Sequence, residues 1–329
     1  MPTIAVVLPL YNGAPYIEEA LDSVFAQTLK PNEIILVDDG STDRSRAIVT
    51  RMIRAGRKIT LLKKENGGQS AARNLGVRRA KSDLIAFLDQ DDAWYPHHLA
   101  TLVAPFRQRR RFPLGWSYGN MDLVDATGRI IVRRFLDTLG CARPKRTLME
   151  CLREDMYVVP NSTLVSRGAI LAVGGFDERL RGYEDDDLFT RLFVAGYDNV
   201  YSEEAITKWR CHGDSCSHSA AMIRSRAIYC KKLLEDFPDM PDIALFFRRD
   251  LLRPRFWNAF AGQYQDAVRR GDLALARACA DGLAVFLPHM PRGLQPYMRM
   301  LLALARSRAG SVLWPVTEVY QNWLAHRRW

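Results

Sequence analysis

The sequence lacks a long run of apolar residues. No stretch of the 329 residues approaches the about 18 apolar positions that a membrane-spanning helix needs, so we expect no transmembrane segment. No basic and then apolar leader precedes the first expected strand, because Met1-Pro2-Thr3 leads directly into apolar residues. The six cysteines form no obvious disulfide framework, which in a chain of this length is typical of a reducing cytosol. We therefore expect a cytoplasmic protein.

The sequence also lacks the Gly-x-Gly-x-x-Gly loop of dinucleotide-binding enzymes. That loop would follow the first strand directly. Residues 4–8 are expected to form this strand, and Tyr11-Asn12-Gly13 follows it with a single glycine. The absence argues against an NAD-dependent enzyme.

What the sequence does contain is typical of an α/β fold. With 48% hydrophobic and 26% charged residues, it is ordinary globular material. Ser41 or Thr42 is expected to cap the second helix, and Ser70 the third. Strands are predicted at the short apolar runs of residues 4–8, 34–37, 59–62 and 84–88. Helical patterns lie between these runs, and the alternation predicts a parallel sheet with helices on both faces.

Three carboxylates, Asp89, Asp91 and Asp92, follow the fourth predicted strand directly. In parallel α/β sheets, ligands bind beyond the carboxyl ends of the strands. Unpaired carboxylates this close together repel one another, and a hard divalent cation compensates them because it prefers oxygen ligands. The pattern predicts a Mn²⁺ or Mg²⁺ site, with a solvated acidic turn as the alternative.

Four motifs together resemble the family 2 glycosyltransferases. They are Val-Leu-Pro-Leu-Tyr-Asn at residues 7–12, Val-Asp-Asp-Gly-Ser-Thr-Asp at 37–43, Asn-Gly-Gly-Gln-Ser-Ala-Ala-Arg-Asn at 66–74 and Phe-Leu-Asp-Gln-Asp-Asp at 87–92. The resemblance extends to about residue 218, two thirds of the chain. It implies a GT-A fold, which is Rossmann-like with a mostly parallel central sheet, and a metal-dependent enzyme that inverts the sugar configuration.

The resemblance also implies roles for individual residues at the donor. Pro9, Tyr11 and Asp39 would hold the nucleotide base, with Asp39 accepting from a uracil imide. Arg73 would lie near the ribose and the phosphates. Asp89 would contact the donor and the metal, and Asp91 is favoured as the direct metal ligand.

A second acidic motif, Gly182-Tyr183-Glu184-Asp185-Asp186-Asp187, is similar to the family's Glu-Asp motif at a helix start. By resemblance, Asp185 would be the catalytic base. Early acidic residues also favour the helix dipole, which is the alternative interpretation of Glu184 and Asp187. Further strands are predicted at residues 114–118, 130–132 and 161–165, and a loop region near the acceptor at 134–156.

The stretch from Trp209 to His218 contains an Arg-x-His pattern. By resemblance, His212 would lie beside the donor diphosphate, and we count it among the metal ligands. A zinc site of Cys211, His212, Cys216 and His218 is the alternative, but this spacing matches no common zinc finger.

The C-terminal region differs from the rest in charge. Residues 219–329 carry 17 basic and 9 acidic side chains, against 30 and 28 in residues 1–218. We expect an all-helical region whose apolar faces pack together or on a second subunit, as a homo-oligomer. Alternatively, a basic amphipathic face rests on an anionic membrane, the inner face of the cell membrane. Nothing here resembles a nucleic-acid module.

The sequence therefore predicts a catalytic domain at residues 1–218 and a helical region at 219–329. The expected activity is sugar transfer from a nucleotide-diphosphate sugar, a UDP-sugar, to a glycan or lipid-linked acceptor in bacterial surface polysaccharide synthesis. The alternatives are a nucleotidyltransferase with a similar acidic site and a non-catalytic scaffold that acts through its C-terminal helices.

Overall fold

The computed structural model describes residues 1–211 and 220–307. The chain divides into two compact units, Met1–Cys151 with Asp155–Ser215 and Leu152–Glu154 with Cys216–Trp329. This division lies close to the predicted one, and the separate functions of the two parts stay a prediction.

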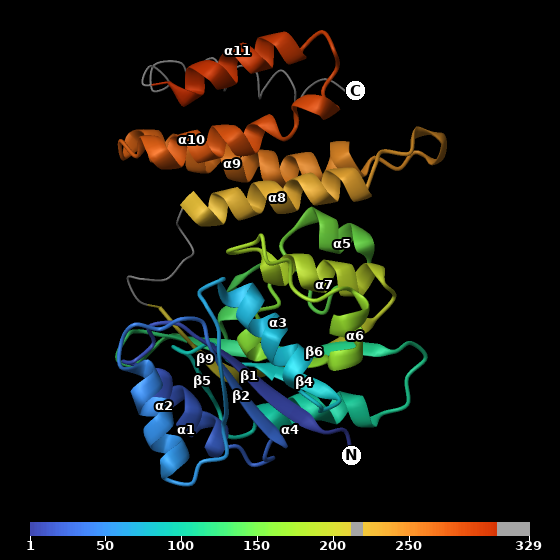
Figure 1. Cartoon of the computed structure of the whole chain (residues 1–329). Helices are drawn as coiled ribbons and strands as arrows, with labels where there is room; N and C mark the ends of the chain where they lie inside the picture. Colours follow the sequence, from blue (N-terminus) through green and yellow to red (C-terminus); the bar gives the residue numbers. More distant parts are fainter. Residues whose placement is uncertain (212–219, 308–329) are drawn as a thin grey trace. The chain divides into compact units, whose positions relative to one another are not determined.

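The first unit is built on one mixed sheet (Figure 1). Its strands are β1 (Ile4–Leu10), β2 (Glu33–Asp38), β3 (Thr60–Lys63), β4 (Leu84–Phe87), β5 (Ala93–Trp94), β6 (Leu114–Val124), β7 (Ile130–Val132), β8 (Thr163–Ser166) and β9 (Asp198–Arg210). Among the described residues, their order in space is β3-β2-β1-β4-β8-β6-β9-β5, with β7 beside β6. β1 to β4 pair in parallel, as predicted, whereas β8 runs antiparallel to both β4 and β6.

Helices cover both faces of this sheet. They are α1 (Ile17–Phe25), α2 (Ser45–Arg54), α3 (Gln69–Arg79), α4 (His98–Val103), α5 (Leu148–Arg153), α6 (Arg167–Ala172) and α7 (Glu184–Val194). Along β1, Val6 and Leu8 join the core with α1, α2 and α4, and Ala5 and Val7 join the core with α3, α6 and α7. Successive strand residues point to opposite faces, so a strand covered on both sides is apolar throughout. The predicted α/β architecture is confirmed.

The start of α2 differs from the prediction. Neither Ser41 nor Thr42 caps this helix, which begins at Ser45. The carboxylate of Asp43 accepts the amide of Ser45 at 2.9 Å instead. The Ser41 hydroxyl accepts the amide of Asn12 at 3.1 Å, so it joins the loops after β1 and β2.

The start of α3 and the later strands also differ from the prediction. Ser70 lies inside α3, and the residue before the helix is Gly68, with a φ of 90°. The Ser70 hydroxyl donates to the carbonyl of Leu180 at 3.1 Å, so a tertiary contact replaces the predicted cap. β6 continues well past residue 118, and the predicted loop region contains α5.

The second unit is helical where it is described. Its helices are α8 (Ala220–Asp236), α9 (Arg253–Arg269), α10 (Leu273–Ala284) and α11 (Gln295–Arg306). α10 packs against α8, α9 and α11 (Figure 1). Tyr229 meets Phe256, and Trp257 meets Phe286, in edge-to-face ring contacts. These apolar faces therefore pack on one another.

Short segments connect the longer elements. They are 3-10 helices at Ala104–Arg107, Phe135–Thr138, Pro160–Ser162, Pro241–Ile243 and Leu287–His289, and a π-helical stretch at Arg248–Leu252. Across residues 1–211 and 220–307, no helix is long and apolar enough to cross a membrane.

Candidate active site

Three strand ends bring the predicted donor residues to one edge of the sheet. β1 lies between β2 and β4 and runs parallel to both. Tyr11 after β1, Asp39 after β2 and Asp89 after β4 therefore follow strands that end on the same side. Pro9 is buried within β1, paired with Val37. Tyr11 is 47% exposed, so its side chain is open to a ligand.

Asp39 is held by the loop that starts α3. Its carboxylate accepts the amides of Gly67 and Gly68 at 2.9 and 2.7 Å. The Lys64 ammonium donates to the same carboxylate at 2.5 Å. The buried Asp39 side chain thus joins β2 to α3, and its contact with a uracil stays a prediction.

The three carboxylates after β4 influence one another electrostatically. Asp92 is buried, where it accepts the backbone amide of Arg210 at 2.8 Å and the side-chain amide of Asn161. Burial raises the pKa of Asp92 well above its usual value, and the charges of Asp91 and Asp89 raise it further. Such a turn is stabilised by any added positive charge.

The carboxylate oxygens of the turn after β4 are suitable ligands for a hard divalent cation. Asp89 and Asp91 offer carboxylate oxygens two positions apart, directly after β4. Mg²⁺ and similar cations are commonly held by one or two carboxylates plus substrate phosphates. Within residues 1–211 and 220–307, no group of three His, Cys, Asp or Glu residues is arranged to hold a metal. A cation here would therefore complete its shell with water and substrate oxygens.

His212 lies outside the described residues, and so do Cys216 and His218. The role of His212 as a metal ligand stays a prediction, as does the alternative zinc site.

Arg73 joins the two acidic motifs. Its guanidinium is 2% exposed and donates to Asp89 at 2.6 Å and to Glu184 at 2.9 Å. Burial lowers the pKa of Arg73, but the two carboxylates outweigh that and raise it. Glu184 also accepts from the Gly182 amide at 2.8 Å and from the side-chain amide of Gln69. The Glu184 carboxylate therefore holds Arg73, Gln69 and the Gly182 amide together. The contact of Arg73 with a sugar-nucleotide donor stays a prediction.

Asp185 differs from the acidic residues around it. It is half-buried in the first turn of α7, where its carboxylate accepts the amide of Asp186 at 2.9 Å. Burial raises the pKa of Asp185 to about 7, and the charge of Glu184 adds to this rise while Arg73 opposes it. Asp187, in contrast, forms an ion pair with Arg191 at 2.6 Å. Asp185 can therefore take up a proton near neutral pH, as a general base must.

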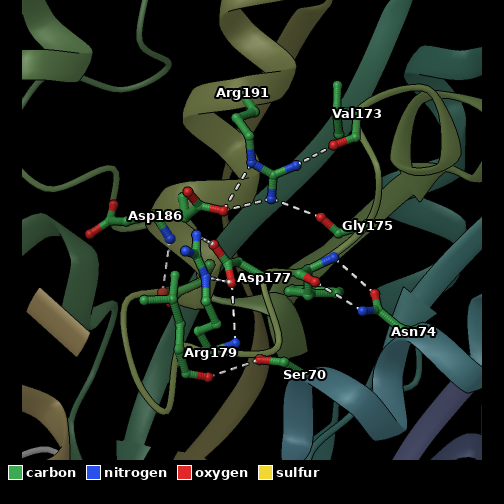
Figure 2. Close-up of polar contacts among 12 residues, drawn as sticks. Ser70, Asn74, Val173, Gly175, Asp177, Arg179, Asp186 and Arg191 are labelled. Carbon is green, nitrogen blue, oxygen red and sulfur yellow. Dashed lines mark hydrogen bonds and ion pairs between the residues drawn. The ribbon is translucent and has the colours of Figure 1, made fainter. Parts of the chain in front are cut away.

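A hydrogen-bonded frame joins α7 and α3 to the segment that follows α6 (Figure 2). Arg191 donates to the carbonyls of Val173 and Gly175 at 2.5 and 2.7 Å. Asn74 of α3 exchanges two hydrogen bonds with the backbone of Phe176. Gly175 has a φ of 77°, and a Cβ there would lie 2.6 Å from Asn74 Oδ1. The turn after α6 is therefore built for glycine, and its backbone is held by both α3 and α7.

Arg210 is a site residue that the sequence motifs did not single out. This buried residue donates from Nε to the carbonyl of Asp91 at 2.7 Å and from Nη2 to Glu19 at 2.7 Å. Its Nη1 donates to the carbonyls of Asp125 and Ala126 at 3.2 and 3.1 Å. Arg210 thereby fixes the backbone of the acidic turn at Asp91. The sequence signal for Arg210 is the arginine of the Arg-x-His pattern.

Comparison with known proteins agrees with this geometry. Residues 5–152 match the profile described as glycosyl transferase family 2. An uncharacterized glycosyltransferase of Rickettsia prowazekii is 30% identical over 226 residues, which cover 67% of this chain and 67% of that protein. Another, from Rickettsia typhi, is 26% identical over 294 residues, covering 82% and 85%.

Solved structures share the fold. The crystal structure of Staphylococcus aureus TarS 1-349 aligns with a TM-score of 0.64 at 19% identity, covering 97% of this chain and 91% of TarS 1-349. The mannosyltransferase PcManGT from Pyrobaculum calidifontis aligns with a TM-score of 0.58 at 19% identity, covering 98% and 86%. The predicted GT-A fold is thereby confirmed. With strand-end motifs, fold and relatives in agreement, the chain belongs to the family 2 glycosyltransferases.

Proposed function

We propose that this protein is an inverting glycosyltransferase that uses a UDP-sugar. The acceptor would be a hydroxyl of a glycan or of a lipid-linked saccharide in bacterial surface polysaccharide synthesis. One observation carries the proposal: Asp185, with a pKa of about 7, adjoins Glu184, which Arg73 joins to Asp89. A proton acceptor and a turn suited to a diphosphate and its cation are thus held in one network.

In the proposed reaction, the acceptor hydroxyl attacks the anomeric carbon of the donor. Asp185 takes the hydroxyl proton, the new carbon–oxygen bond forms, and the bond to the diphosphate breaks with its electron pair. A single displacement inverts the anomeric centre, so no nucleophilic carboxylate is required. Mn²⁺ or Mg²⁺ held by Asp89 and Asp91 would supply Lewis-acid stabilisation of the departing diphosphate. Tyr11, Pro9 and Asp39 would hold the nucleotide base. The donor would then be held in the geometry for attack and would not depend on a chance encounter with the acceptor.

The choice of a uridine nucleotide rests on the likeness to TarS. Solved structures of TarS 1-349 contain UDP or UDP-GlcNAc, and PcManGT was solved with GDP-Man and Mn²⁺. Calorimetric titration of UDP and GDP in Mn²⁺ tests this choice, and tighter binding of GDP would contradict it. Release of UDP from a UDP-sugar tests the activity. Pyrophosphate release would instead indicate a nucleotidyltransferase, and no turnover with any sugar nucleotide would indicate a scaffold.

Removal of divalent cations is expected to abolish transfer. The donor diphosphate would then approach the carboxylates of Asp89 and Asp91 without the divalent cation that offsets their repulsion. Initial rates after exhaustive chelation, and again after adding Mn²⁺, measure this effect. Full activity in the chelated protein would overturn the metal assignment.

We also propose that the C-terminal unit attaches the enzyme to an anionic membrane surface. α11 carries Arg299 and Arg306 and no acidic residue, although Arg306 also pairs with Asp281 of α10 at 2.7 Å. Its exposed residues include Tyr297 and Met300, at 39% and 52% exposure. Polybasic attraction contributes about 1 kcal/mol per charge near an anionic surface and is screened by salt. These features support peripheral binding at the inner face of the cell membrane.

The protein is therefore expected to co-sediment with anionic lipid vesicles at low salt and to dissociate at high salt. Replacing both Tyr297 and Met300 by Ser should weaken the binding, because apolar insertion is lost. Leu273→Ser, at a similarly exposed apolar residue of α10, is the matched control. Absence of binding at any salt would contradict the membrane proposal. The exposed face of α11 would then be expected to contact a second copy of the chain, and sedimentation velocity would detect the dimer.

A further inference from the structure

Gln90 connects two loops of the site. It lies between Asp89 and Asp91, and its carboxamide faces the backbone of Tyr11. The Tyr11 amide donates to Gln90 Oε1 at 2.8 Å, and Gln90 Nε2 donates to the Tyr11 carbonyl at 3.0 Å. A carboxamide offers a donor and an acceptor side by side, as a peptide group does. Gln90 therefore continues the pairing of β1 with β4 past the point where the two backbones separate.

Gly13 makes room for this contact. A Cβ built on Gly13 would lie 2.5 Å from Gln90 Oε1 and 2.6 Å from Gln90 Cδ. The φ of Gly13 lies outside the left-handed region, so its backbone accepts any residue. The carbonyl of Gly13 also accepts the amides of Tyr16 and Ile17, both at 3.0 Å, at the start of α1. An alanine at this position would thus force the Gln90 carboxamide away from Tyr11 without straining the backbone.

We propose that Gln90 is a positioning residue that holds the turn of Asp89 and Asp91 in register with the Tyr11 loop. The inference rests on the proposed function, in which Tyr11 borders the nucleotide base and the two aspartates border the diphosphate. Both ends of the donor then meet a surface that is arranged before binding. Ordering such loops during binding costs affinity, and arranging them beforehand removes that cost.

The alternative is that Gln90 only closes a loop and has no effect on the donor. The two roles predict different effects of the Gln90→Ala change on the affinities for UDP and for uridine. Uridine lacks the diphosphate, so it reports on the Tyr11 side alone. A positioning role predicts a larger loss for UDP with Mn²⁺ than for uridine, whereas general loosening of the fold would weaken both ligands equally.

The test compares wild-type protein with Gln90→Ala, Gly13→Ala and the double variant by calorimetric titration. UDP affinity in Mn²⁺ is expected to fall about tenfold in each single variant, because the two loops must then be ordered during binding without the two hydrogen bonds that held them in the free protein. The double variant should bind no more weakly than either single variant, because both changes remove the same contact. Gly262→Ala is the matched control, since Gly262 lies in α9 with open space around its Cβ position.

Each other outcome overturns the inference in a recognisable way. Unchanged UDP affinity in Gln90→Ala, or additive losses in the double variant, contradicts the role of Gln90 and leaves the proposed function intact. Equal losses for UDP and uridine assign Gln90 to the fold alone. Wild-type protein that binds no nucleoside diphosphate contradicts the proposed function, and the role of Gln90 with it.

Discussion

Replacing Asp185 by Asn is expected to lower turnover by about 10²–10⁴-fold, the usual contribution of a general base. The substitution keeps the size of the side chain and removes its ability to take a proton. Affinity for UDP should remain at the wild-type value, because an interaction made only in the transition state affects turnover and not donor binding. Initial rates and calorimetric titration on the same preparations measure both quantities.

The pH dependence provides a second signature of Asp185. Its pKa is raised to about 7, so below that pH the carboxyl is protonated and cannot accept the acceptor's proton. Wild-type turnover should therefore rise with pH and level off above about 7. Asp186→Asn, the same change one residue along, is the matched control, because Asn keeps the acceptor for the Met156 amide. Wild-type turnover by Asp185→Asn would place the base elsewhere, although Glu184 and Asp187 are already paired with Arg73 and Arg191.

Replacing Arg73 by Met is expected to lower the free energy of unfolding by about 3–5 kcal/mol, because it leaves a buried carboxylate without its cation. Arg73 and Glu184 are both nearly inaccessible to solvent, so water does not replace the lost partner. Urea denaturation of the two proteins measures the difference. Arg179→Met is the matched control, because the Arg179 side chain is 66% exposed in its pair with Asp177. Exposed ion pairs contribute about 0–1 kcal/mol.

A second variant separates a lost ion pair from lost packing. Arg73→Met combined with Glu184→Gln removes the buried negative charge together with the positive one. This double variant should recover much of the lost stability, since the penalty in the single variant comes mainly from the unpaired carboxylate. If Arg73→Met unfolds at the same midpoint urea concentration as the wild-type protein, the stabilising role of the ion pair between Arg73 and Glu184 is contradicted.

Much of the candidate site was predictable because its residues stand at strand ends. Strands covered on both faces are continuous apolar runs, which the sequence displays openly at residues 4–8 and 84–88. Parallel strands end at one edge, so their order along the chain is enough to predict that Tyr11, Asp39 and Asp89 lie together. Residue order alone thus indicated the α/β architecture and the edge that bears the site.

The half of the sheet beyond β4, where parallel and antiparallel pairs are mixed, was less predictable. β8 pairs with both β4 and β6, and β9 runs beside β6 over most of its length. Strand partners of this kind are chosen by long-range packing, and a local pattern does not state which strand lies beside which. For the same reason, the expected cap at Ser70 was replaced by a bond to Leu180.

The sequence by itself determined the family, the succession of the strands β1 to β4 along the chain and the acidic turn, because each is written in short runs of neighbouring residues. Tertiary structure alone decided the partners of Arg73 and Arg210. Arg73 meets Glu184 across 111 positions, and Arg210 meets the Asp91 carbonyl across 119. No periodicity encodes contacts at such separations. The rise in the pKa of Asp185 has the same origin, since it arises from burial and from Glu184, and burial exists only once the chain has folded.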